Sequence, residues 1–124
     1  MPDFSNFSPA GVDDFFDAFT GELTSVAGEW WTTNKSAVGG YVRALAEASA
    51  QTQNALAEGR ISANVADQAL RMQQATFRQT IRYTELMQYA LAQKVVDMLF
   101  SMVGWAIFNK TGVNLFPELV KPED

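Results

Sequence analysis

The residues best placed for binding chemistry in this chain are three arginines. Arg71, Arg78 and Arg82 follow one another at intervals of seven and four residues, so on a helix they share one side. Residues 60–82 contain four arginines and one acid, whereas residues 1–34 contain six acids and no base. Three interpretations remain open: a solvated polar face, pairing with acidic helices of another copy, and contact with nucleic acid.

The residue types that carry most enzyme chemistry are absent or lack a recognisable arrangement. The chain contains no histidine and no cysteine, which removes the commonest general base near neutral pH, thiolate nucleophiles and disulfides. Its carboxylates do not follow the D-x-D-x-D-G spacing of a calcium loop, and Gly39 and Gly40 belong to no phosphate-binding motif. We therefore predict that the protein is not an enzyme and has no catalytic residue, metal site or cofactor.

Length and composition predict one all-α domain over residues 1–124. The four prolines lie at positions 2, 9, 117 and 122, and helix-favouring Ala, Gln, Glu, Leu, Met and Arg dominate the chain between them. Hydrophobic residues make up 48% of the sequence, which argues against a disordered chain. Binding nucleic acid over a whole protein surface requires an excess of Lys and Arg, and the net charge here is −5. Nucleic acid is therefore not an expected partner.

An N-terminal amphipathic helix is predicted over residues 8–33. Ser8 is the expected N-cap and Pro9 the first helical residue. Apolar residues then recur at intervals of four and three, which is the spacing of a helix seam. On the opposite face, Gly21 and Gly28 would let another backbone come close at some cost in helix stability.

A helical hairpin is predicted next, after a polar break at residues 32–36. Its two helices are expected over residues 36–58 and 62–108. The turn between them contains Gly59, and Ser62 is the expected N-cap of the second helix.

The predicted helix over residues 62–108 makes the expected molecule elongated, because it would be roughly 69 Å long if unbroken. We expect it to end before Gly112, with residues 109–124 forming an extended C-terminal arm. Three polar residues interrupt its apolar seam and suggest hydrogen bonds between helices. They are Gln74, Thr84 and Gln88.

The stretch MLFSMVGWAIF, residues 98–108, raises the question of a membrane. As a helix it covers roughly 16 Å, about half of a bilayer's hydrocarbon thickness. Extending it back to residue 86 would place Lys94 and Asp97 inside the membrane. Burial against neighbouring helices or subunits is therefore favoured, and membrane contact through residues 95–108 is the alternative.

The apolar helix faces and the arm together exceed what a lone chain of this length is expected to cover. We therefore predict a homo-oligomer or a place in a larger protein assembly. The contacting side chains are predicted to be Phe16, Phe19, Trp30, Met98, Phe100, Met102, Trp105 and Phe116, with Arg71, Arg78 and Arg82 as polar partners.

Residues 36–108 combine an alanine- and glutamine-rich helix pair, ALAEASAQTQNALAEGRISANVADQALRMQQATFRQTIR, with the apolar stretch MLFSMVGWAIF. In composition and layout this region resembles small internal or minor structural proteins of phage particles. The resemblance implies a virion subunit present in many copies, one that can meet membrane during genome delivery.

The predicted function is that of a non-enzymatic structural or assembly subunit that self-associates through helix packing. One alternative is a membrane-associating or membrane-inserting protein that acts through residues 95–108. Another is a helical adaptor or inhibitor that binds a different protein. The N-terminus MPDFSNFSPAG does not resemble a signal peptide, so we expect synthesis in the cytoplasm, followed by incorporation into a particle or by membrane association.

Overall fold

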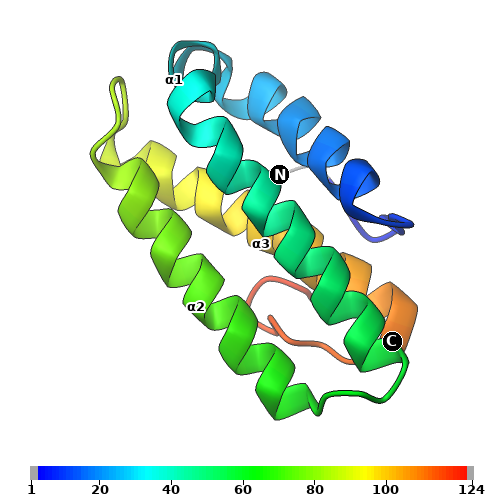
Figure 1. Ribbon diagram of the computed structural model, residues 1–124. Helices are drawn as coiled ribbons and strands as arrows, with labels where there is room; N and C mark the ends of the chain where they lie inside the picture. Colours follow the sequence, from blue (N-terminus) through cyan, green and yellow to red (C-terminus); the bar gives the residue numbers. More distant parts are fainter. Residues whose placement is uncertain (1–2, 123–124) are drawn as a thin grey trace.

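The computed structural model describes residues 3–122, and these form three helices and no strand (Figure 1). The prediction of an all-α fold is confirmed. The first two residues of the predicted domain and the last two of the predicted arm, residues 123 and 124, lie outside the described residues. The helices are α1 (Val12–Ala57), α2 (Ala63–Arg82) and α3 (Tyr89–Thr111).

Helix α1 consists of two antiparallel segments. Ala27 has φ −139° and ψ 43°, which interrupts the helix. Figure 1 shows the chain reversing direction between the two segments. We call residues 12–26 the N-segment and residues 28–57 the C-segment. An ion pair of 2.9 Å between Asp13 Oδ1 and Arg43 Nη2 joins the two segments.

The predicted start of the first helix and the predicted break after it are both wrong. The helix begins at Val12, and residues 8–10 lie outside it. Pro9 O instead accepts a hydrogen bond from Gln53 Nε2 at 3.3 Å. The polar residues 32–36 are helical. Their one buried member, Asn34, donates to Trp30 O at 2.9 Å, one helical turn back, and to Glu85 O at 2.8 Å, so tertiary contacts of this residue hold the polar turn in the helix.

The predicted continuous helix over residues 62–108 is also wrong, because a loop at residues 83–88 separates α2 from α3. The loop contains neither proline nor glycine, and side chains of α1 hold it. Trp30 Nε1 donates to Thr84 Oγ1 at 2.7 Å, and Asn34 Nδ2 donates to Glu85 O at 2.8 Å. Thr84 was predicted to make a hydrogen bond between helices, and it instead accepts one in the loop from Trp30 of α1. Since α2 and α3 fold back on each other, the expected 69 Å helix does not form.

Glycines mark the two other helix ends. Gly59, with φ +73°, lies in the turn after α1, and Ser62 Oγ then accepts a hydrogen bond from Val65 N at 3.2 Å at the start of α2. Gly112 ends α3 with φ +78°, a conformation that glycine adopts at little cost.

Helix α3 lies at the centre of the core. It packs against α1 and α2, and the C-terminal arm runs between α2 and the second half of α3 (Figure 1). Among the described residues, α3 is the one helix long and apolar enough to cross a membrane, yet 67% of its most apolar window is buried inside the fold. Its apolar surface is therefore used mainly for packing within the chain.

Candidate functional site

Most of the apolar residues predicted to contact other copies are covered by their own chain. Because the chain folds back at residues 27 and 83–88, both segments of α1, α2 and the arm can pack around α3. The surplus of apolar surface expected from a long, open hairpin therefore does not arise. Buried side chains are Phe19, Trp30, Met98, Phe100, Met102 and Phe116, and half-buried ones are Phe16 and Trp105.

Arg71 fastens the C-terminal arm to α2. Its guanidinium lies 2.7 Å from Glu118 Oε1, donates to Leu115 O at 2.9 Å, and stands 4.4 Å from the ring centroid of Phe116. The hydrogen bond with Arg71 lowers the pKa of Glu118 below its ordinary value, and the same bond raises the pKa of Arg71. Arg71 is therefore engaged within the chain and is not a free partner for another molecule.

The arm also packs closely against α3 beneath this ion pair. A Cβ atom at Gly104 would lie 2.6 Å from Val120 Cγ2 and 3.3 Å from Phe116 Cβ, so only glycine leaves room for the arm here. The rings of Phe100 and Phe116 are 5.6 Å apart. The arm thus completes the core of its own chain.

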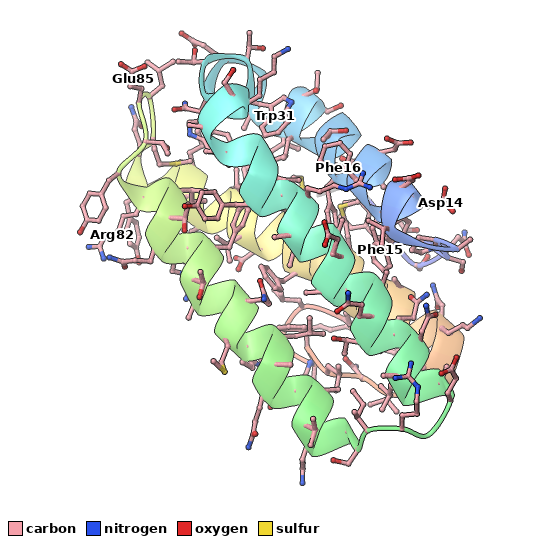
Figure 2. All side chains as sticks on the ribbon, in the orientation of Figure 1. Asp14, Phe15, Phe16, Trp31, Arg82 and Glu85 are labelled. Carbon is pink, nitrogen blue, oxygen red and sulfur yellow. The ribbon has the colours of Figure 1, made fainter. Side chains whose placement is uncertain are left out.

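Arg78 and Arg82 differ from Arg71 in having no acidic partner. Both are exposed near the C-terminal end of α2, and no carboxylate of residues 3–122 lies within 4 Å of either guanidinium. Arg82 stands 5.6 Å from the ring centroid of Tyr83 and points away from the bundle (Figure 2). The three arginines on one side of the predicted helix are therefore divided between two environments.

Next to these arginines, the loop between α2 and α3 and the first residue of α3 expose three large apolar side chains. We call residues 83–89 the tip. Tyr83 is 76% exposed, Leu86 53% and Tyr89 85%. They are three of the six large hydrophobic side chains exposed in residues 3–122, and they are concentrated in seven residues. Tyrosine and arginine together are typical of the centres of protein interfaces.

The base of the tip is held while its apolar side chains face solvent. The hydrogen bonds from Trp30 and Asn34 fix the backbone around Thr84 and Glu85. Leu86 has φ +65°, a left-handed conformation that costs a non-glycine residue about 1 kcal/mol or more. The fold thus holds Leu86 in a strained backbone conformation, and the Leu86 side chain is exposed.

A pocket of about 310 Å³ lies beside the tip, between the end of α2 and the start of α3. No acidic side chain lines it, so it contains no carboxylate pair for acid and base chemistry. Among the described residues, no cluster of carboxylates could hold a metal ion. The pocket can accept an apolar group beside a negative charge. Its lining includes Arg78, Arg82, Tyr83, Met87, Tyr89 and Gln93.

Sequence reasoning missed Tyr83, Leu86 and Tyr89 as candidate contact residues because it placed them inside a continuous helix. A signal for them does exist. The seam of the predicted helix repeats every seven residues from Leu70 and from Gln74, and none of the three lies at one of these positions. Large apolar residues outside the apolar seam of a helix are candidates for a second contact surface.

Comparison with known proteins adds no relative: no family model, no curated protein and no solved structure matches this chain. Its function must therefore be argued from the tip and from the surfaces that could cover it.

Proposed function

We propose that this protein is a non-enzymatic assembly subunit and that the tip is the surface through which it self-associates. The observation that carries the proposal is the exposure of Tyr83, Leu86 and Tyr89 within seven residues, which are three of the six large hydrophobic side chains exposed in residues 3–122. A many-copy particle, which the resemblance to phage structural proteins implies, is a setting in which such a subunit would act.

The anchored backbone of the tip supports this role. Because Thr84 and Glu85 are already hydrogen-bonded to α1, little backbone ordering remains to oppose binding. Burying an apolar side chain contributes roughly 1.5–3 kcal/mol. Three such side chains offset only part of the cost of association, so we expect weak, concentration-dependent assembly.

The membrane alternative places different demands on the fold. Residues 95–108 are mostly buried, so insertion through this segment would require α3 to leave its own core. Self-association through the tip requires no such opening. The adaptor alternative uses the same tip with a different protein, and it predicts a chain that stays monomeric alone.

Light scattering coupled to size-exclusion chromatography tests the proposal. The average molar mass of the wild-type protein should rise above the monomer value of 13.7 kDa as the protein concentration increases. Replacing Tyr83 and Tyr89 together by serine should move this rise to a concentration higher by at least a factor of about ten, because 1.4 kcal/mol of lost burial already corresponds to tenfold in affinity. Tyr41→Ser is the matched control, since Tyr41 is 50% exposed on the C-segment of α1 and is not part of the tip.

A wild-type chain that remains monomeric at high micromolar concentration would contradict the proposal. Flotation with vesicles that contain anionic lipid then separates the alternatives. Binding of the monomer to vesicles would favour the membrane role. If instead the wild type associates in light scattering and the tyrosine variant associates equally well, the self-association surface lies elsewhere.

A further inference from the structure

We infer that the surface covering the tip is the acidic side of the α1 N-segment of a second copy, so that subunits join head to tail. This inference rests on the proposed self-association and names its second surface. We call Asp14, Asp17 and Gly21 the acidic row. These three residues are exposed and follow one another at intervals of three and four along the N-segment.

The charges of the row are only partly used inside the chain. Asp14 Oδ2 accepts a hydrogen bond from Ala10 N, and neighbouring Asp13 pairs with Arg43. Asp17 has no lysine or arginine of residues 3–122 within 4 Å. The helix dipole favours acids in the first turn of a helix, and Asp17 lies beyond that turn.

Gly21 is the second unexplained feature of the row. Glycine inside a helix is destabilising relative to alanine. Here a Cβ atom at Gly21 would meet nothing within 4 Å, so no part of the described chain needs the missing side chain. An aromatic ring from outside, such as Tyr83 or Tyr89 of another copy, could lie directly on this helix surface.

The two surfaces are opposite in charge and similar in scale. Arg78 and Arg82 are four residues apart on α2, which is about 6 Å along the helix, and the row from Asp14 to Gly21 extends about 10 Å. Two unpaired guanidinium groups can therefore face the acidic end of the row while the tyrosines reach its glycine. The pairing joins Arg78 and Arg82 to Asp17, one of several carboxylates that make no salt bridge in residues 3–122.

The positions of the two surfaces require the partner to be a different copy. Asp14 and Arg82 lie at opposite edges of the molecule (Figure 2). Each bound pair therefore keeps one free tip and one free row. Such contacts close into a ring or continue as a filament, in contrast to a symmetric dimer in which the same patch meets itself.

Complementary variants test the pairing. The tip variant carries Arg78→Glu and Arg82→Glu, and the row variant carries Asp17→Lys and Gly21→Gln. These four side-chain positions make no salt bridge in the described structure. Each variant alone should associate at least about tenfold more weakly than wild type, because each opposes like charges across the contact. An equimolar mixture should regain association, because the unchanged row of the tip variant can still meet the unchanged tip of the row variant, and the two charge-reversed surfaces also carry opposite charges.

The possible results separate this inference from the proposed function. If the row variant assembles like wild type while the tip variant is monomeric, the tip remains the self-association surface and the acidic row is overturned as its partner. A mixture that stays monomeric overturns the pairing in the same way. A wild-type chain that never associates overturns both proposals.

The single substitution Gly21→Gln supplies a readout in which stability and association change in opposite directions. Glutamine is a better helix former than glycine, so thermal unfolding should shift upward by a few degrees while association weakens. Gly40→Gln is the control, since Gly40 is exposed, has nothing within 4 Å of its Cβ position and lies on the C-segment of α1. It should raise stability without changing association. If Gly21→Gln leaves association at the wild-type level, the inference is wrong.

Discussion

The two halves of α2 place the same residue type in opposite situations. In the first half, Arg71 holds Glu118 and the carbonyl of Leu115 and lies over the ring of Phe116. At the far end, Arg78 and Arg82 are exposed without an acidic partner in the described chain, beside two exposed tyrosines. The difference arises because the C-terminal arm covers only the first half. Binding capacity is therefore left at the end of α2 that no segment of the chain covers.

The largest expected difference between the two ends concerns an aromatic ring at each. Phe116→Ala should lower the free energy of unfolding by about 3–5 kcal/mol, because Phe116 is fully buried and its removal leaves a cavity between the arm and α3. Tyr83→Ala is the control at the tip and should change stability by less than about 0.5 kcal/mol. Urea unfolding measures both. Similar losses for the two variants would show that the tip is packed as firmly as the arm.

A smaller difference is expected between the arginines themselves. Arg71→Ala should cost about 1–2 kcal/mol of unfolding free energy, since it removes charge-assisted hydrogen bonds and a stacked guanidinium at a partly exposed site. Arg78→Ala should remain within about 0.5 kcal/mol of wild type. Thermal or urea unfolding of the two variants provides the comparison. Equal effects would mean that the contact between Arg71 and Glu118 contributes little in solution.

The smallest effect is a pH dependence confined to the arm. Glu118 has a lowered pKa when folded, so its carboxylate stabilises the fold above its ordinary pKa, and this stabilisation is lost as pH falls through the lowered value. The stability difference between wild type and Glu118→Gln should therefore be largest near neutral pH and should shrink on acidification. Unfolding curves collected from neutral to acidic pH measure it. In an Arg71→Ala background the difference should vanish, and its persistence there would assign it to another contact.

Local sequence signals located several features of the fold. The absence of interior proline predicted helices, and Gly59, Ser62 and Gly112 lie at helix ends where their chemistry is needed. These residues act through their own backbone conformation or through an amide three residues away. Such effects depend little on the rest of the molecule, which is why they can be predicted from the sequence.

The candidate site could be predicted only in part. The arginines were identified because their spacing on a helix is regular, and the acidic N-terminal segment was identified from composition. The sequence did not indicate the exposed side chains of the tip, because the loop at residues 83–88 contains no glycine or proline from which a turn could be predicted. These side chains are Tyr83, Leu86 and Tyr89. The loop is held by Trp30 and Asn34, about fifty residues earlier in the chain.

The sequence alone determined that the chain is helical, where one turn and one helix stop lie, and how its charges are divided. Only the tertiary structure decided that Phe100 and Phe116 lie in the chain's own core, that Arg71 is engaged, and that the tip is exposed. The physical reason is range. Helix propensity and capping act over a few neighbouring residues, whereas burial and the bonds from Trp30 and Asn34 depend on segments that meet only after the chain has folded.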